Sequence, residues 1–180
     1  RLQDAYQTGQ AFDRVQVTAW NLPSHLTRLY FQIDTKGLLY KKELYASSYE
    51  SRYKLHYALY NLESPSLVSD SLTRFYVDTL HYQTRSVITD SLELRPLLAG
   101  TYILQVRLTD LNNGSENLVY LRLKNSDALQ QQDFILRDQA GNVSFHPYLT
   151  NPSKPVFLCF RDASVPRLTV RYYKREYPIA

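Results

Sequence analysis

The feature that most constrains this chain is an alternation of apolar and polar side chains with a period of two. Residues 53–62 read YKLHYALYNL and residues 101–109 read TYILQVRLT. Such alternation is typical of strands with one buried face, and it places Tyr57 and Tyr102 on the buried faces of their strands. No apolar period of 3.6 residues persists for three turns, so we expect little helix.

The same pattern predicts about eight strands in residues 11–125 and four shorter strands after residue 133. They lie near residues 14–20, 28–34, 38–46, 53–62, 73–79, 84–94, 101–109 and 116–124, and then near 134–137, 142–146, 156–161 and 167–173. Turns are expected at 35–37, 112–114 and 139–142, because Gly and Asn tolerate the positive φ that tight turns need.

Strands at this spacing predict an all-β chain with an antiparallel immunoglobulin-like β-sandwich over residues 11–125. Tyr102, just after Gly100, stands where such sandwiches can place a tyrosine whose hydroxyl bonds back to the preceding corner. An ordinary core tyrosine in a strand is the alternative. Both interpretations favour a sandwich.

A polar stretch at 125–133 marks the end of the sandwich. Over residues 126–180 we expect part of a second small β domain. Four of its prolines, at 147, 152, 155 and 166, leave room only for short strands. A segment of this size buries too little surface to be stable alone. It therefore either packs on the first domain or is the opening half of a second sandwich that the sequence cuts short.

Composition and charge exclude several classes of protein. One Cys rules out an internal disulfide, and five scattered Gly supply no phosphate-binding loop. We find no metal-ligand spacing and no catalytic motif, so we expect no cofactor, no metal and no enzymatic activity. The net charge is +4, but acids are interleaved with bases: 14 Lys+Arg against 12 Asp+Glu up to residue 125, then 7 against 5. This distribution argues against nucleic acid as a partner.

The 16 tyrosines are the one enrichment that could carry function. Tyr45, Tyr49 and Tyr60, like Tyr30, fall near strand ends or off the core phase, and exposed Tyr gives large contact area at low entropic cost. The alternative is an aromatic-rich sandwich whose solvent edges carry Tyr without a ligand. The locally basic tail adds three further candidate binding residues, Arg171, Lys174 and Arg175.

The residues at the end of the sandwich and beyond it carry a family resemblance. The segments PLLAGTYILQVRLTDLNNG, NVSFHPYLTNP and LTVRYYKREYPIA are similar to the amino-terminal region of the GWxTD-domain proteins of Bacteroidota. The defining Gly-Trp-x-Thr-Asp motif is absent, because the single Trp, Trp20, is followed by Asn21 and Leu22. The resemblance implies an amino-terminal fragment of an extracytoplasmic envelope protein, in the periplasm or at the outer membrane, and a lipid anchor upstream would fit it.

We therefore expect a non-enzymatic interaction or scaffold module of a bacterial cell envelope, with a protein partner. A glycan-binding module that uses exposed Tyr rings is the alternative, and it requires rings lined up in a groove or on a flat face. No apolar run is long enough for a helix to cross a bilayer, so we expect no transmembrane segment.

Overall fold

Strands dominate the described part of the chain, and its helical content is limited to short 3-10 turns. The structure, a computed structural model, describes residues 15–23, 26–63, 68–80, 86–95, 97–126, 130–145 and 156–161. The strands are β1 (Val15–Asn21), β2 (Thr27–Asp34), β3 (Tyr49–Asn61), β4 (Val68–Leu80), β5 (Val87–Leu94), β6 (Gly100–Asp110), β7 (Glu116–Asn125), β8 (Phe134–Asp138) and β9 (Val156–Phe160). The turns are η3 (Thr35–Gly37) and η4 (Gln131–Asp133). The all-β prediction is confirmed.

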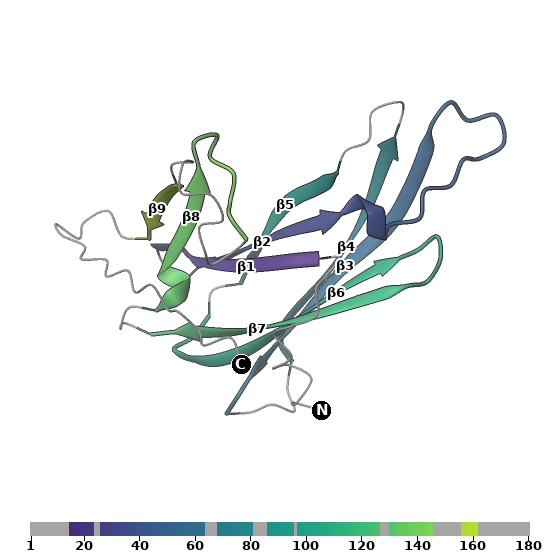
Figure 1. The fold of residues 1–180 in the computed structure, drawn as a ribbon. Helices are drawn as coiled ribbons and strands as arrows, with labels where there is room; N and C mark the ends of the chain where they lie inside the picture. Colours follow the sequence, from purple (N-terminus) through teal and green to yellow (C-terminus); the bar gives the residue numbers. More distant parts are fainter. Residues whose placement is uncertain are drawn as a thin grey trace, which may run out of the picture.

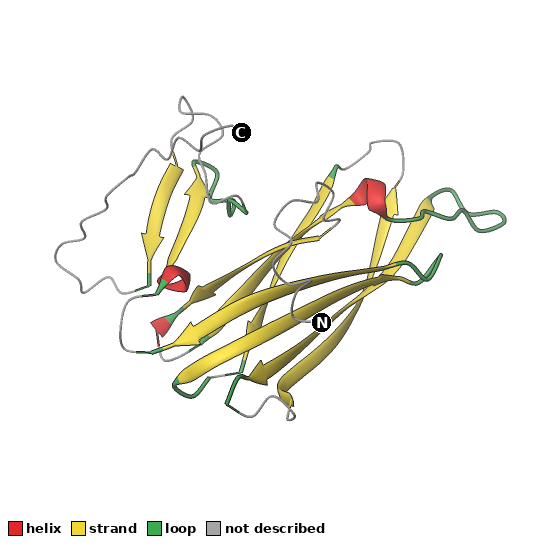
Figure 2. Cartoon of the chain, turned by 60° about the horizontal axis from the view of Figure 1, so that its bottom comes forward, coloured by secondary structure: helices red, strands yellow, loops and turns green. Residues whose placement is uncertain are grey.

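Seven of these strands form two antiparallel sheets packed face to face (Figure 1, Figure 2). One sheet has the order β1-β2-β5, and the other has the order β4-β3-β6-β7. In the seven-strand constant-type immunoglobulin arrangement, the fourth strand lies in the same sheet as the first, second and fifth strands. Here β4 instead pairs with β3, in the sheet that also contains β6 and β7. The result is an immunoglobulin-like sandwich with three strands in one layer and four in the other.

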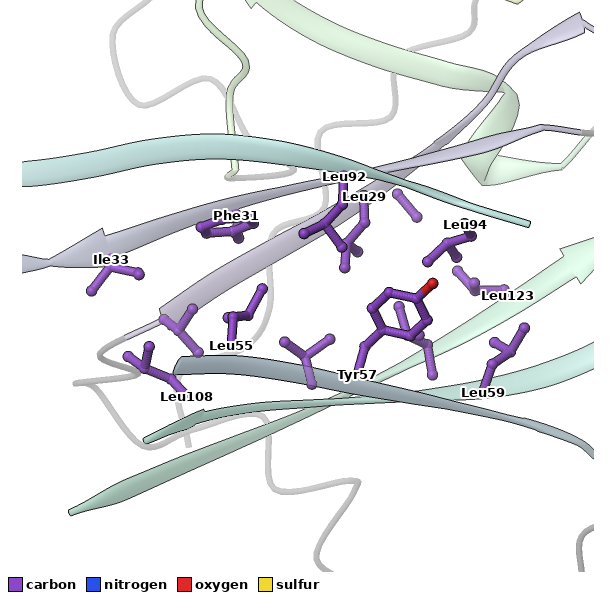
Figure 3. Close-up of a cluster of buried hydrophobic side chains, with 14 of the residues drawn as sticks. Leu29, Phe31, Ile33, Leu55, Tyr57, Leu59, Leu92, Leu94, Leu108 and Leu123 are labelled. Carbon is purple, nitrogen blue, oxygen red and sulfur yellow. The ribbon is translucent and has the colours of Figure 1, made fainter. Parts of the chain in front are cut away.

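The core follows the alternation that the sequence shows (Figure 3). Leu29, Phe31 and Ile33 of β2 are fully buried and face the other sheet. Tyr57 on β3 and Tyr102 on β6 are 3% and 4% exposed, as expected for the inward phase of their strands. Each buried Leu, Ile or Phe side chain contributes about 1.5–3 kcal/mol relative to an exposed one, so this inter-sheet layer dominates stability.

The strand expected at 38–46 is not formed, so the sandwich has seven strands rather than eight. Residues 35–48 instead carry the chain from one sheet to the other, and only Lys41 makes a bridge, to Glu50. The physical reason is the run of three charged residues from Lys41 to Glu43. Because consecutive residues of a strand point to opposite faces, this run would place charges on both faces, and neither could pack on the core.

Tyr102 forms the expected corner. Its hydroxyl donates a 3.0 Å hydrogen bond to the backbone carbonyl of Leu98, four residues upstream. Gly100, between them, has a φ of 155°, which side-chain-bearing residues rarely adopt. This hydrogen bond confirms the tyrosine-corner interpretation over that of an ordinary core tyrosine.

The part of the chain after the sandwich that the structure describes contains one two-stranded antiparallel sheet, β8 with β9. Of the strand expected at 142–146, the described residues 142–145 form one bridge, between Arg137 and Val143, after the turn at 139–142 reverses the chain through Gly141 at a φ of 83°. The strand expected at 167–173 lies outside the described residues.

This segment contacts the sandwich through polar side chains. Asp133, which is fully buried, accepts a 2.9 Å hydrogen bond from Asn21 Nδ2 and pairs with Arg161 Nη1 at 3.3 Å. Arg137 lies over the rings of Trp20 and Tyr30, with centroid distances of 5.5 and 5.7 Å. Residues 130–138 thus cover the outer face of β1 and β2.

Candidate binding site at the loop end of the sandwich

Two connections that the structure describes lie at one end of the sandwich, and we call them together the loop end. They are residues 35–48, between β2 and β3, and residues 111–115, between β6 and β7. Both leave their sheets at this end because β2 and β6 run toward it while β3 and β7 run away. The longer connection is the loop that projects furthest in Figure 1.

The base of the longer loop is fixed to the shorter one by a buried carboxylate. Asp110, 2% exposed, accepts hydrogen bonds from the backbone N–H groups of Leu39 at 2.6 Å and Asn112 at 2.8 Å. Asn112 Nδ2 in turn donates to the carbonyls of Leu39 at 2.7 Å and Glu50 at 3.0 Å. A hydrogen bond to a charged acceptor is worth about 1.5–3 kcal/mol, so these contacts hold the loop against the turn.

Further contacts tie the loop to β3 and β4. The backbones of Lys41 and Glu50 exchange two hydrogen bonds, of 2.9 and 2.8 Å. The Tyr40 hydroxyl donates a 2.7 Å hydrogen bond to Asp78 Oδ2 on β4. Leu38 is buried against the core. The loop therefore has a fixed base, formed by residues 38–41, beneath its tip.

The tip of the loop presents two large side chains to solvent. Leu44 is 83% exposed and Tyr45 is 98% exposed. Tyr45 has a φ of 73°, a left-handed conformation that costs a non-glycine residue roughly 1 kcal/mol. The turn is closed by a 3.0 Å hydrogen bond from the Ala46 N–H to the Glu43 carbonyl. An apolar side chain and an aromatic one are thus displayed side by side on a turn that the fold holds in place.

Charged and aromatic residues surround this tip. Arg52 on β3 pairs with Glu43 at 3.2 Å and with Glu50 at 3.4 Å, and all three side chains are partly exposed. The Lys42 ammonium lies 5.8 Å from the centroid of the Tyr49 ring, which is 48% exposed. An apolar tip with a rim of charges is typical of the surfaces that proteins use to bind one another.

The structure separates the tyrosines that the sequence singled out. Tyr45 and Tyr49 share the loop end, but Tyr60 lies at the opposite end of β3, where it pairs with Ile103 and is partly buried. Tyr30 does point away from the core as its phase requires, yet it is only 9% exposed because Arg137 covers it and donates to its hydroxyl at 2.9 Å. The expectation that Tyr30 lies at an open edge is therefore wrong.

The three basic candidates, Arg171, Lys174 and Arg175, lie outside the described residues. Sequence reasoning missed Leu44, because the expected strand at 38–46 gave it a place in a sheet. A large apolar residue directly after a run of three charges was the signal that could have identified it.

A groove of about 540 Å³ lies between the sandwich and β8. Its walls come from β1, β7, β8 and the residues that follow, and they are mostly apolar, as with Val17, Leu121, Ile135 and Phe145. Arg122 is the only charged residue among those that line it, so the groove offers no pair of groups for acid–base chemistry.

No family model matches this chain, and no curated protein matches it. Among solved structures, it is similar to the crystal structure of a putative beta-galactosidase from Bacteroides fragilis, at 15% sequence identity and a TM-score of 0.37. The similarity covers 63% of this chain and 16% of that protein, and it is too low to support an argument about function.

Among the residues that the structure describes, no helix is both long enough and apolar enough to span a bilayer.

Proposed function

We propose that this chain is a non-enzymatic interaction module of a bacterial cell envelope, and that Leu44 and Tyr45 at the loop end contact its protein partner. The observation that carries the proposal is the pairing of near-complete exposure with a fixed base. A loop backbone that is already held in place loses little conformational freedom on binding, which leaves more of the contact energy for affinity. Tyr adds contact area at low entropic cost.

The absence of catalysis is the second part of the proposal. The groove beside β8 is lined without a carboxylate or a histidine. At the loop end, Glu43 and Glu50 are engaged by Arg52, and Asp110 is occupied by backbone N–H groups. These acids serve to shape the loop, which supports a scaffold role for the surface. Hydrolase activity in a broad substrate screen would contradict this part.

The location outside the cytoplasm rests on the resemblance of residues 96–114, 142–152 and 168–180 to the amino-terminal region of GWxTD-domain proteins. An open reading frame that continues into a Gly-Trp-x-Thr-Asp region would support both the family and the compartment. Fractionation of cells that express the full protein, with the chain recovered among cytoplasmic proteins, would contradict the location.

The alternative function, glycan binding, needs aromatic rings in line. Tyr45 and Tyr49 are both exposed at the loop end, but Tyr60 is at the other end of β3, so the three predicted rings form no row. We therefore treat glycan binding only as a possible result of the binding experiment. Binding of the chain to a glycan array, lost in the loop variant below, would replace the protein partner by a sugar.

The test is comparative capture from an envelope extract of the organism that encodes the chain. The immobilised wild-type chain is expected to retain specific proteins that the variant Leu44→Ser/Tyr45→Ser does not retain. Leu98→Ser is the matched control, because Leu98 is 82% exposed and lies in the connection at the other end of the sandwich. Identical sets of proteins on all three chains would overturn the proposal.

A further inference from the structure

Strand β4 is an edge of the four-stranded sheet. One side of it pairs with β3 along twelve registered positions, and no described strand pairs with its other side. It is thirteen residues long and contains no proline. An edge strand exposes a row of backbone N–H and C=O groups that another strand can bind, and natural proteins protect such edges by shortness, charge or proline.

The outer face of β4 lacks this protection. Phe75 and Val77 are 72% and 62% exposed there. The other residues of that phase are uncharged as well: Ser69, Ser71, Thr73 and Thr79. By contrast, β7, at the opposite edge of the same sheet, carries Glu116, Arg122 and Lys124 on this face. The uncharged outer face is therefore a property of β4 and not of the whole sheet.

Besides the buried Asp70, β4 carries two charged residues, and these have opposite sign. Arg74 is exposed, and Asp78, four residues later, is partly exposed. They lie on the same face of the strand as Tyr76, which stands midway between them and stacks on Tyr53 at 5.2 Å. A strand with this pattern is complementary to itself when a second one runs antiparallel to it.

We propose that β4 pairs antiparallel with β4 of a second copy of this chain, with the twofold axis at Tyr76, to form a continuous eight-stranded sheet. In this register Arg74 of each copy stands opposite Asp78 of the other, twice in the dimer. Phe75 stands opposite Val77 of the second copy, also twice. Directly opposite residues in an antiparallel pair interact most strongly, so two ion pairs and two apolar pairs form together.

Neighbouring registers do not give this match. An axis at Arg74 places two Arg74 side chains opposite each other, and an axis at Asp78 does the same for two carboxylates, which is destabilising. An axis at Phe75 or at Val77 leaves both charges opposite uncharged residues. Symmetric pairing about Tyr76 is thus the one register among these that satisfies the charges, and the symmetry makes a second copy the occupant that the edge fits.

Sedimentation velocity over a concentration series tests the proposal. The wild-type chain is expected to dimerise, and Phe75→Lys is expected to weaken the dimer by about tenfold, because it places a charge at the centre of the edge. Leu118→Lys is the matched control: Leu118 is 40% exposed on the same face, but on β7. It is expected to leave the dimer unchanged.

A charge exchange tests the register. Arg74→Asp alone and Asp78→Arg alone each create two like-charged pairs across the axis, so each variant is expected to be monomeric. An equimolar mixture of the two restores both ion pairs and is expected to dimerise. Asp78 also holds the Tyr40 hydroxyl, so circular dichroism of each variant accompanies the measurement, and Phe75→Lys gives the answer if Asp78→Arg fails to fold.

A monomeric wild-type chain at all concentrations would overturn the proposal. So would a dimer that Phe75→Lys leaves intact, because that dimer would use another surface. Leu44→Ser/Tyr45→Ser is expected to dimerise like the wild type, which separates this proposal from the one about the loop end.

Discussion

The backbone N–H of Leu39 donates a 2.6 Å hydrogen bond to the Oδ2 of Asp110, and this contact joins two connections that are 71 residues apart in the sequence. Asp110 ends β6, and Leu39 begins the stretch that leads to the exposed tip. The base of the candidate binding loop is therefore held by a residue at the end of the neighbouring strand.

Replacing Asn112 by Ala is expected to loosen the loop without unfolding the sandwich. The change removes the two hydrogen bonds from Asn112 Nδ2 to the carbonyls of Leu39 and Glu50. We expect a loss of about 1–2 kcal/mol in the free energy of unfolding and faster amide hydrogen exchange in residues 39–50. Asn113→Ala is the control, because the Asn113 side chain accepts a hydrogen bond from the Ser115 N–H within the turn itself. Equal exchange rates in the two variants would contradict the anchoring role.

Tyr57→Phe is expected to destabilise the chain although the ring stays in place. The Tyr57 hydroxyl donates a 2.8 Å hydrogen bond to the buried Asp70 Oδ2, which also accepts from the Arg95 N–H at 3.3 Å. Removing a donor from a buried carboxylate costs about 2 kcal/mol, measurable by chemical denaturation. Tyr120→Phe, on an exposed position, is expected to cost far less. A Tyr57→Phe variant as stable as the wild type would refute this assignment.

Alkaline pH is expected to weaken the fold. Burial, reinforced by the hydrogen bond to Asp70, raises the pKa of Tyr57 far above its ordinary value of 10.0, and burial also raises the pKa values of Tyr76 and Tyr102. These groups stay protonated in the folded chain while they ionise in the unfolded one. Their contribution is thus complete below pH 10 and falls above it, by up to about 1.4 kcal/mol per pH unit for each group.

Denaturation curves between pH 8 and pH 12 check this sign. The contribution of these tyrosines to the free energy of unfolding is expected to be constant between pH 8 and about pH 10 and to decline at higher pH. The decline is expected to be shallower in Tyr57→Phe. Stability that rises above pH 10 would show that the tyrosines are not the groups that matter there.

Asp133→Ala is expected to release the β8 segment from the sandwich. The change leaves Asn21 Nδ2 without its acceptor and Arg161 without its partner. Removing one partner of a buried ion pair lowers the free energy of unfolding by about 3 kcal/mol. Hydrogen exchange in residues 130–145 is expected to accelerate more than in β3 and β6. Asp138→Ala serves as the control, because it removes only hydrogen bonds from Asn142 in the exposed turn that follows β8. Similar exchange of residues 130–137 in both variants would argue against the contact.

Much of the sandwich could be predicted because alternation determines which face of a strand is buried. Phase alone predicts that Tyr57 and Tyr102 lie in the core, whereas the nearby Gly100 makes the corner at Tyr102 only one of two interpretations. The loop at 35–48 could not be recognised in the same way. Whether a segment pairs as a strand depends on which sheet its neighbours join, and the sequence does not reveal that β2 and β3 belong to different sheets.

Contacts between distant residues explain the other errors. Tyr30 has the phase of an exposed residue, but Arg137, 107 positions later, covers its ring. Tyr45 was selected as a binding residue within an expected strand, and the structure places it instead on a turn, with Leu44 beside it. The type of residue was thus informative, whereas its surroundings depended on the tertiary fold.

The most direct test of the central claim, that the loop end is the binding surface, is the affinity of the captured partner for single variants of this chain. Binding isotherms are expected to show a loss of about tenfold, or 1.4 kcal/mol, for Leu44→Ser and for Tyr45→Ser, with no change for Leu98→Ser. Equal affinities for all of these chains would contradict the account and place the binding surface elsewhere.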